Sequence, residues 1–341
     1  MTKKIKIGVI GAGRIGKIHI ENLCYRVPSA EVVGISEVEV AVPATKEWAK
    51  QYGITNVVSN PSILINDPNI DAILICSPTN THADLIIEAA AAGKDIFCEK
   101  PIANDLVKTR EALAAAEKAG VKLQLGFNRR FDPNFKRIRE LVQTSELGQT
   151  HIIKITSRDP EPPPAEYVKG SGGIFMDMTI HDFDMARYLA GSDVTEVYAS
   201  GAVLIDPAIG QAGDYDTAVI VLKFANGSTC VIDNSRQAVY GYDQRVEVFG
   251  SKGSAVAYNN TPTSVEVSTE NGVFTDKPLY FFLERYMDSF VQELRDFVAA
   301  LQGGSEPPVT GKDGLQSLLI ALAATKSARE NRPVQISEVL C

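Results

Sequence analysis

The stretch IKIGVIGAGRIGKIHIENL, residues 5–23, decides the fold. A short apolar run leads directly into the glycine-rich turn GAGRIG, residues 11–16, and a run with helical spacing begins inside that turn. In such a strand, turn and helix, the first glycine makes the tight turn, the second admits a pyrophosphate and the third lets the helix pack closely. The pattern predicts a dinucleotide-binding unit, with the anion at the helix N-terminus. The expected loop contacts are Gly11, Ala12, Gly13, Arg14, Ile15 and Gly16.

Glu37 favours NAD as the cofactor. It lies 21 residues after Gly16, at the expected end of the second strand, where a carboxylate accepts hydrogen bonds from both ribose hydroxyls of NAD. Such a carboxylate repels the 2'-phosphate of NADP, and no Arg or Lys follows until Lys46. Glu39 is the alternative ribose ligand, and a solvated acid at a strand end is the interpretation without a cofactor role.

The first 125 residues have the pattern of a parallel sheet. Short apolar runs alternate with amphipathic runs over residues 5–124, as parallel strands joined by covering helices require. We therefore expect an α/β domain, a doubly wound Rossmann sheet, over residues 1–125. The expected strands are residues 6–10, 31–36, 72–76, 95–98 and 122–125. The clearest helices are residues 81–92 and 106–119, and a glycine follows each of them.

Beyond Gly126 the pattern changes to extended runs joined by short turns. The turn signals Asn226-Gly227 and Ser251-Lys252-Gly253 favour hairpins, so we expect a mainly antiparallel sheet in an α+β domain over residues 126–341. The expected strands are residues 151–156, 195–203, 217–224, 228–233 and 245–249. The expected helices are residues 133–142, 283–301 and 315–330, and we expect the last to pack near the first domain.

Composition excludes several classes of partner. The formal net charge is −8 and no Lys/Arg cluster is present, so nucleic acid is not an expected partner. No apolar stretch approaches the roughly 20 residues of a membrane-spanning helix. The five cysteines are scattered, without the spacing of a metal site, which predicts reduced thiols, a cytoplasmic location and no metal.

Two segments place polar side chains at expected strand ends, the edge where open α/β sheets bind ligands. The loop CSPTNTH, residues 76–82, could line a nicotinamide pocket, or Asn80 or Thr81 could only cap the next helix. In CEKP, residues 98–101, the Lys100 ammonium could bind a hydroxyl and favour its alkoxide, or be a solvated surface charge. The further cofactor contacts expected from these segments are Ser77, Pro78, Thr79, Asn80, His82, Glu99 and Lys100.

Asp177 and His181 are a candidate acid and base. They lie four residues apart, and in one continuous helix their side chains would share a face. Histidine ionises nearest neutrality and is the natural acceptor for an alcohol proton, whereas a histidine on a half-apolar helix is also a common core residue. His19 and His151 have no titratable partner at an informative spacing, and we expect them to be structural or exposed.

Taken together, GAGRIG, CSPTNTH, CEKP, GFNRRFD (residues 126–132) and the Asp177/His181 pair resemble the glucose-fructose oxidoreductase and inositol dehydrogenase family. The resemblance extends to GKDGLQSLLIALAATKSARENRPV, residues 311–334. Within the family, three stretches are most similar to NAD-dependent inositol 2-dehydrogenases: SRDPEPPP at 157–164, SGGIFMDMTIHDFDMARYL at 171–189 and YGYDQRVEVFGSKG at 240–253.

The resemblance implies a function and a site. It implies NAD-dependent oxidation of a secondary hydroxyl of a cyclic polyol, above all of myo-inositol to 2-keto-myo-inositol. It also implies an open-faced sheet in the second domain and a homodimer or homotetramer formed through that face. The implied catalytic triad is Lys100, Asp177 and His181. These three residues also contact the polyol, and the other implied polyol contacts are Arg129, Asp159, Tyr240 and Tyr242.

Other activities remain open at this point. A scyllo-inositol or glucose-type dehydrogenase of the same family is one. A glycosidase that retains NAD and cleaves by transient oxidation is a second, since this fold hosts such enzymes, and free NADH release would separate it. A non-catalytic dinucleotide sensor is a third, which the presence of Lys100, Asp177 and His181 disfavours.

Overall fold

The structure is a computed structural model that describes residues 3–340. The chain divides into two compact units, and each is described by itself. The first unit contains Met1–Asn128 and Asp288–Leu315, and the second contains Arg129–Met287 and Gln316–Cys341. The first unit therefore includes residues 288–315, which the expected division at residue 125 assigned to the second domain.

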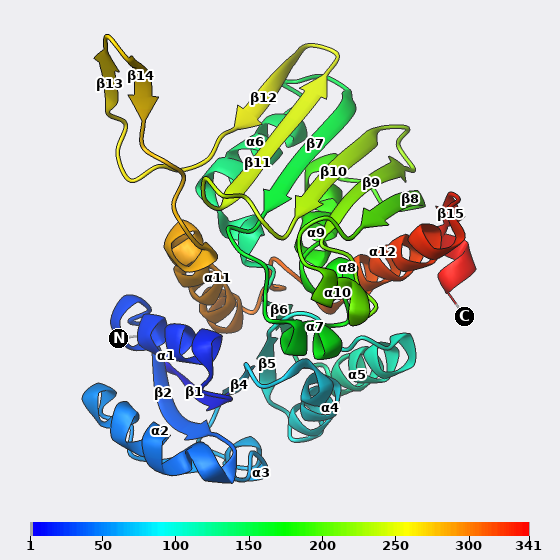
Figure 1. Ribbon diagram of the computed structural model, residues 1–341. Helices are drawn as coiled ribbons and strands as arrows, with labels where there is room; N and C mark the ends of the chain where they lie inside the picture. The colour runs from blue at the N-terminus through cyan, green and yellow to red at the C-terminus, as the bar shows by residue number, and fades with distance from the viewer. Residues whose placement is uncertain (1–2, 341) are drawn as a thin grey trace. The chain divides into compact units, whose positions relative to one another are not determined.

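The first unit is built on one parallel six-stranded sheet (Figure 1). Its strands are β1 (Ile5–Ile10), β2 (Ala30–Ser36), β3 (Val57–Val58), β4 (Ala72–Ile75), β5 (Asp95–Cys98) and β6 (Leu123–Leu125). All neighbours pair in parallel, in the order β3-β2-β1-β4-β5-β6. The predicted doubly wound Rossmann sheet is confirmed. The order reverses between β1 and β4, and such sheets bind ligands where it reverses.

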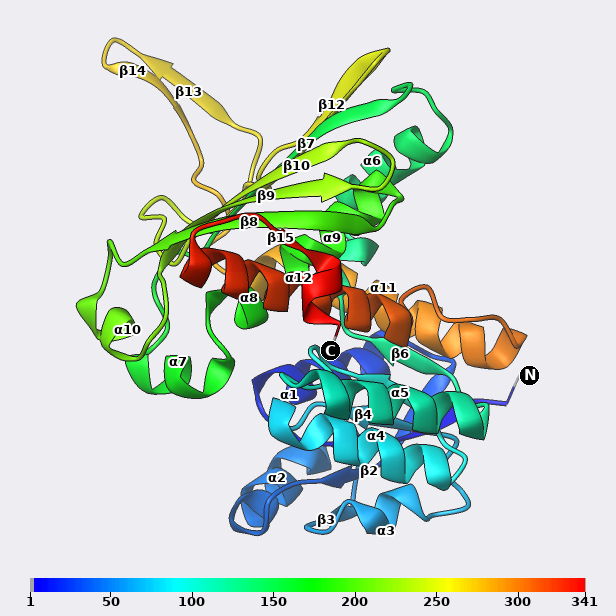
Figure 2. The same cartoon turned by 90° about the vertical axis from the view of Figure 1, so that its right-hand side faces the viewer.

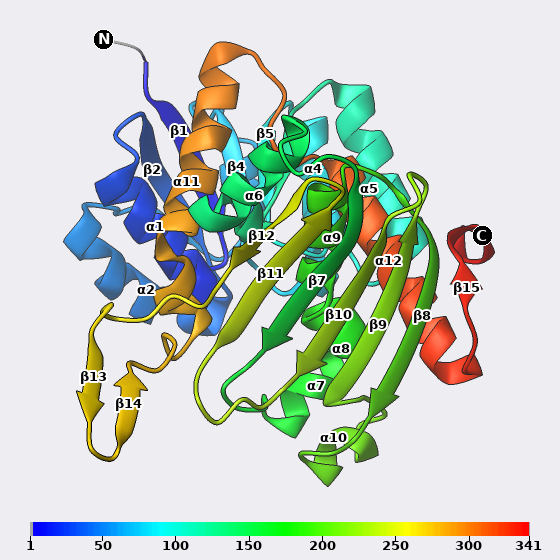
Figure 3. The ribbon, with the colours of Figure 1, turned by 90° about the horizontal axis from the view of Figure 1, so that it is seen from above.

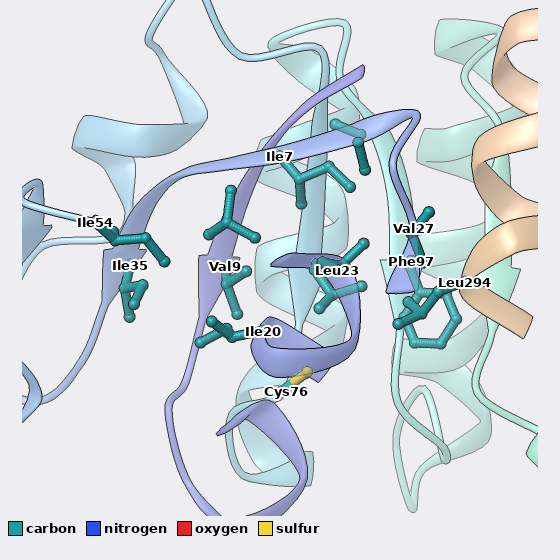
Figure 4. Close-up of a cluster of buried hydrophobic side chains, with 14 of the residues drawn as sticks. Ile7, Val9, Ile20, Leu23, Val27, Ile35, Ile54, Cys76, Phe97 and Leu294 are labelled. Atoms are coloured by element: carbon teal, nitrogen blue, oxygen red, sulfur yellow. The ribbon is translucent and has the colours of Figure 1, made fainter. Parts of the chain in front are cut away.

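Helices cover the strands of this unit. They are α1 (Arg14–Arg26), α2 (Val42–Ala49), α3 (Ser62–Ile65), α4 (His82–Ala91), α5 (Leu106–Ala119) and most of α11 (Phe282–Gly303). Figure 4 shows the core, in which Leu294 of α11 lies against Phe97 of β5 and near Leu23 of α1. These side chains are almost completely buried, so α11 completes the core of the first sheet although it begins only at Phe282, far beyond the last strand of this sheet, which ends at Leu125.

The second unit is built on a seven-stranded sheet, seen from above in Figure 3. Its strands are β7 (Thr150–Arg158), β8 (Val194–Ala202), β9 (Thr217–Phe224), β10 (Thr229–Ser235), β11 (Asp243–Gly250), β12 (Gly253–Ala257) and β15 (Val334–Gln335). The order is β12-β11-β7-β10-β9-β8-β15. The expected hairpins at Asn226-Gly227 and Ser251-Lys252-Gly253 join β9 to β10 and β11 to β12. The sheet is mainly antiparallel as predicted, with one parallel pair, β7 and β10.

One face of this sheet is covered and the other is open (Figure 2). Helices α8 (Ile174–Asp177), α9 (Ile180–Ala190) and α12 (Gly311–Glu330) lie on one face, and Ser327 of α12 accepts the backbone N–H of Ala199 at 2.9 Å. Side chains alternate along β9 and β10 between buried and exposed, as one covered face requires. The exposed large apolar side chains of the open face are Ile152, Tyr198, Val219, Val231, Phe249 and Val256.

The remaining elements lie around this sheet. They are α6 (Pro133–Gln143), α7 (Ala165–Ser171), α10 (Pro207–Gln211) and a separate hairpin of β13 (Glu266–Thr269) and β14 (Gly272–Thr275).

The region around Asp177 differs from the single continuous helix in which Asp177 and His181 would share a face. It forms α8 and α9, and Met178 and Thr179 lie between them. Within residues 3–340, no helix is long and apolar enough to cross a membrane.

Candidate active site

The glycine loop has the geometry of a cradle for a pyrophosphate. Gly11 has a φ of +92°, and a Cβ there would lie 2.7 Å from the backbone of Cys76 and Ser77. A Cβ on Gly16 would lie 2.1 Å from the Gly11 carbonyl oxygen, so only glycine lets α1 start this close to the turn. Gly13 precedes α1, and a Cβ there would meet no atom within 4 Å. The loop is tight at its two ends and open in its centre, where the anion would bind.

Glu37 lies beside this loop, at the end of β2. Its Oε2 accepts the backbone N–H of Ala12 at 2.6 Å, and its Oε1 accepts the backbone N–H of Val38 at 2.8 Å. The carboxylate is therefore fixed against the glycine turn, whereas Glu39, the alternative ribose ligand, is exposed. Because its two bonds hold its orientation, Glu37 is the better placed of the two to meet a ribose.

The loop after β4 is held by its own side chains. The hydroxyls of Ser77 and Thr81 lie 2.6 Å apart, and the Thr81 hydroxyl donates to the Pro78 carbonyl at 2.8 Å. The His82 ring is buried, with Nε2 2.7 Å from the Ser77 carbonyl oxygen and Nδ1 2.8 Å from that of Pro101. Both His82 ring nitrogens are thus occupied by the main chain. This geometry fits a residue that holds two loops together, and it leaves Ser77 to Asn80 as the cofactor contacts expected from this loop.

Glu99 and Lys100 follow β5 directly, at the same edge of the first sheet as the glycine loop. Lys100 is half-buried. Glu99 turns its carboxylate inward, and Oε1 accepts Nε2–H of His19 on α1 at 2.7 Å. The first unit therefore places the glycine loop, Glu37, the loop after β4 and Lys100 at the same edge of one parallel sheet.

In the second unit, Asp177 ends α8 and His181 is the second residue of α9. The Tyr167 hydroxyl donates to Asp177 Oδ1 at 2.8 Å, and Arg236 donates from Nη1 to Oδ2 at 3.3 Å. The Arg236 side chain is about 98% buried and also donates to Asp214 at 3.4 Å. Asp177 is therefore held by a tyrosine and a buried cation, which suits an acid that orients a neighbouring base.

Asp159 shares this polar cluster. Burial raises the pKa of its carboxyl from 3.8 to about 6, although Arg236 and Arg129 oppose the shift and Asp177 adds to it. The backbone N–H of Asp159 donates to the carbonyl of Ser235 at the end of β10, and Ser235 directly precedes Arg236 in the chain. A carboxyl group whose pKa is raised by burial is typical of functional sites, because burying an ionisable group in this way does not stabilise the fold.

Arg129 is also buried in the second unit. Its Nη1 donates to Asp182 at 2.5 Å, its Nη2 donates to Ser157 at 3.3 Å, and its guanidinium lies 5.8 Å from the centre of the Tyr286 ring. Asp182 in turn accepts from Asn234 at 2.9 Å. These contacts fix the guanidinium in a buried network, so any polyol contact from Arg129 would come from a rigid side chain.

The two expected tyrosine contacts have different environments. Tyr240 is 39% exposed, donates its hydroxyl to Asp243 at 2.6 Å and accepts from Arg158 at 3.1 Å. The Tyr242 ring is buried, 6.0 Å from the ring of Tyr286, and burial raises the pKa of its hydroxyl. Tyr242 is part of the packed interior beside Arg129, whereas Tyr240 belongs to a surface network.

Sequence reasoning missed Arg236, Tyr167 and Glu293. Arg236 directly follows a strand, and Tyr167 lies in a short helix after the proline-rich run at 160–164, so neither has a motif of its own. Glu293 lies within α11 and enters the first unit from a distant part of the chain. Only the pairing of β7 with β10 and the packing of α11 reveal them.

The doubly wound sheet, the glycine loop at its switch point and the polar side chains at the strand ends define the class of dinucleotide-binding dehydrogenases. The chain belongs to the GFO/IDH/MocA oxidoreductase family. The family domain described as "oxidoreductase family, NAD-binding Rossmann fold" matches residues 5–127. The GFO/IDH/MocA C-terminal domain matches residues 135–256.

Similar proteins cover 98% of the chain. An uncharacterized oxidoreductase of Bacillus subtilis, YrbE, is 57% identical over 98% of this chain and 98% of its own. The myo-inositol 2-dehydrogenase of Thermotoga maritima is 51% identical over 98% of this chain and 100% of its own. A crystal structure of a probable dehydrogenase from Thermotoga maritima has a TM-score of 0.95 at 51% identity and covers 98% of this chain and 100% of its own. The resemblance stated from the motifs is confirmed.

Proposed function

We propose that the protein oxidises a secondary hydroxyl of a cyclic polyol with NAD, and that it converts myo-inositol to 2-keto-myo-inositol. The observation that carries this proposal is the similarity over 98% of the chain to an enzyme named myo-inositol 2-dehydrogenase. It is supported by the geometry of the glycine loop and by the buried polar cluster around Asp159 and Asp177.

The cofactor contacts come from the first unit. Gly13 leaves the room that a pyrophosphate needs, and the N-terminus of α1 supplies unpaired N–H groups beside it. Glu37 accepts hydrogen bonds from the ribose hydroxyls. Its Oε2 then either gives up the hydrogen bond from the Ala12 N–H or accepts from that N–H and a hydroxyl together. When bound, the nicotinamide supplies hydride acceptance at its C4.

The catalytic roles fall to three side chains. Lys100 binds the reacting hydroxyl through its ammonium and stabilises the negative charge that develops on this oxygen. His181 takes the hydroxyl proton, and Asp177 orients the imidazole. Tyr167 and Arg236 hold Asp177, so that its carboxylate keeps one position throughout the reaction.

The second unit supplies the polyol contacts. Asp159 in its ionised form accepts hydrogen bonds from ring hydroxyls, and Arg129 donates to them from a guanidinium that Asp182 holds in place. Tyr240 and Tyr242 complete the expected set of contacts. Specificity among inositol isomers then depends on which ring hydroxyls meet these fixed donors and acceptors.

Steady-state assays test the function directly. NADH formation is followed with myo-inositol, scyllo-inositol, chiro-inositol and glucose, each with NAD and with NADP. We expect the highest kcat/KM with myo-inositol and NAD, because Glu37 repels a 2'-phosphate. Turnover with NADP that equals or exceeds turnover with NAD would contradict the role of Glu37. Glycoside cleavage without release of NADH would identify the NAD-retaining glycosidase, and cofactor binding with no turnover would identify the sensor.

The protein also assembles, we propose, as a homodimer or homotetramer through the open face of the second sheet. Six large apolar side chains are exposed there within one contiguous sheet. Apolar surface of this extent on a soluble chain is typical of a subunit interface. An isologous pairing of two such faces would bury both of them.

A further inference from the structure

A second histidine–carboxylate cluster lies inside the first unit, and the catalytic proposal does not use it. His19 on α1 donates from Nε2 to Glu99 Oε1 at 2.7 Å. Glu293 on α11 reaches the same place, with Oε1 4.0 Å from His19 Nε2. The side chains of His19 and Glu293 are completely buried, and that of Glu99 is 13% exposed. No titratable partner lies at an informative spacing from His19 in the sequence, and the fold supplies two from distant segments.

Glu293 is the unusual member of this cluster. Neither of its carboxyl oxygens has a hydrogen-bond partner among the described residues, and His19 Nδ1 has none either. Burial raises the pKa of Glu293 well above 4.5, and the neighbouring Glu99 raises it further. An ionised carboxylate without a hydrogen-bond partner is unfavourable in this position, so we expect Glu293 to hold a proton.

Among residues 3–340, no lysine or arginine pairs with the Glu293 carboxyl group. The titratable groups that face it are Glu99, His19 and the Cys76 thiol, whose own pKa is raised by burial and by both glutamates. The aromatic rings of Phe97 and Phe290 pack edge-on against His19, at 5.4 and 5.8 Å. A proton on Glu293 leaves one negative charge, that of Glu99, beside His19, whereas two ionised glutamates would repel each other there.

Glu99 connects this cluster to the proposed catalytic lysine. It precedes Lys100 directly at the end of β5, and its backbone N–H is bonded to Ile75 of β4 at 2.9 Å. Its carboxylate fills a space that Gly126 leaves, since a Cβ at this position would lie 2.8 Å from Glu99 Oε2. Glu99 is thus held at its backbone by the sheet and at its carboxylate by α1, the helix that begins at the glycine loop.

We propose that His19, Glu99 and Glu293 form a buried positioning triad that fixes the main chain carrying Lys100. The proposal rests on the role proposed for Lys100, and it deepens that role. In this proposal the carboxylate of Glu99, which was expected from the sequence to contact the cofactor, is engaged by His19 instead, and the three residues act through Lys100. They couple the helix of the pyrophosphate loop to the strand end that presents the ammonium.

A divalent cation is the competing occupant, because one ligand atom from each of the three residues lies within 4.8 Å of the others. The His19–Glu99 contact argues against it. The two atoms are 2.7 Å apart, a hydrogen-bond distance, and a carboxylate at this distance pairs with the tautomer whose Nε2 carries the hydrogen, which has no lone pair at Nε2 for a metal. The experiment below keeps the metal as an outcome.

Thermal unfolding of the full chain tests the protonated glutamate without any assay of activity. A folded-state pKa above the unfolded value of about 4.3 gives stability that is present below that value and is lost as the pH rises through the folded pKa. Glu293→Gln removes this loss. We therefore expect the Tm of Glu293→Gln minus that of the wild type to grow by several degrees from pH 5.5 to pH 8.5.

Two results would overturn the assignment of a proton, and not a metal ion, to this cluster. A Tm difference that does not change with pH would show that Glu293 does not hold the proton, and a fall of the wild-type Tm in EDTA would show a bound metal. Glu99→Gln serves as the second variant if Glu293→Gln does not fold. Removing the charge of Glu99 lowers the pKa of Glu293, so the decline of Tm over the same pH range becomes shallower than in the wild type.

The positioning role is tested by His19→Leu and His19→Gln, with Leu23→Ala as the control. Leu23 is buried four residues further along α1 and has no polar link to Glu99. We expect His19→Leu to lower kcat by about tenfold or more with an unchanged KM for NAD. His19→Gln restores most of kcat, because its Nε2 can still donate to Glu99, and Leu23→Ala lowers Tm but keeps kcat. Losses of kcat that follow the losses of Tm in all three variants would overturn the proposal.

A readout of Lys100 itself separates failure of the triad from failure of the proposed function. The rate at which an acylating reagent modifies Lys100 is measured by mass spectrometry against pH, with exposed Lys46 as the internal reference. We expect His19→Leu to change the ratio of the two rates at least threefold. An unchanged ratio overturns the triad even if no polyol is oxidised, and a wild-type enzyme that is inactive on every polyol overturns only the function.

Discussion

At the scale of single residues, the four histidines occupy four different environments. His19 is buried against Glu99, and His82 is tied to two carbonyl oxygens. His151 is exposed beside the Phe249 ring, and His181 is half-buried at the start of α9. A proton acceptor for a substrate needs access to that substrate and a neighbouring group to orient it. Together with the proposed role of Asp177, this combination favours His181.

Replacing His181 separates the base from the rest of the site. We expect His181→Ala to lower kcat by about 100- to 10,000-fold while the Kd for NAD, measured by calorimetry, is unchanged. Asp177→Asn also lowers kcat, but adding it to His181→Ala costs little more, because an orienting residue acts only through the base. His151→Ala is the control and keeps full activity. Near-normal turnover of His181→Ala would make His181 a packing residue.

Asp159 offers a prediction in which stability and function oppose each other. Its folded-state pKa of about 6 exceeds the unfolded value, so its stabilising contribution is present at acid pH and lost as the pH rises through 6. At pH 7.5 we expect Asp159→Asn to be more stable than the wild type by up to about 3 kcal/mol, with no gain at pH 4. Its KM for the polyol should rise.

Denaturant unfolding at the two pH values measures the stability of Asp159→Asn. Asp84→Asn, a change at an exposed aspartate on α4, is the control and should show no dependence of its stability difference on pH. A gain for Asp159→Asn that is equal at pH 4 and pH 7.5 would show that the carboxyl is not held near protonation by its surroundings.

At the scale of elements, the turn between β1 and α1 carries two glycines with separable roles. Gly13 has room for a methyl group in the protein alone, with a φ of −69° that alanine tolerates, and Gly16 has none. We expect Gly13→Ala to keep the wild-type Tm but to weaken NAD binding at least tenfold, because its methyl group occupies the space of the pyrophosphate. Gly16→Ala should lower Tm by several degrees, because α1 must move from the turn. Equal effects of the two changes on Tm would contradict this division.

The elements also show where sequence reasoning works. Each predicted strand and helix of the first unit is present, because apolar runs, glycine turns and helix ends are local signals. The short strand β3 and the helices α2 and α3 carried too weak a pattern to be predicted, and Met178 and Thr179 interrupt the helix considered for Asp177 and His181. The glycine loop and Lys100 could be located from the sequence because each follows directly on a strand, β1 or β5.

The partners of the site residues could not be predicted. The contact of Arg236 with Asp177 spans 59 residues and that of His19 with Glu99 spans 80, so each depends on the pairing or packing of distant elements. The same reason explains α11, whose apolar spacing predicts a helix but not the sheet that it completes. Periodicity shows that a face is buried, and only the fold shows what buries it.

At the scale of the whole molecule, the open sheet face predicts the assembly. Val231 lies on β10, a central strand of the second sheet, with its side chain on the exposed face. We expect Val231→Glu to reduce the mass measured by sedimentation to that of a smaller species, since a buried unpaired charge opposes association. Val107→Glu, on an exposed site of α5, is the control and leaves the mass unchanged. A wild-type protein that is monomeric at micromolar concentration would contradict the proposed assembly.

Transfer of a labelled hydrogen tests the central claim most directly. Myo-inositol that carries deuterium on its C2 carbon is oxidised by the wild-type protein with NAD, and the NADH is examined by proton NMR. The account predicts one deuterium per molecule of NADH, at C4 of the nicotinamide, because the hydride moves from the ring carbon to the cofactor. NADH without deuterium, or no NADH at all with myo-inositol, would contradict it.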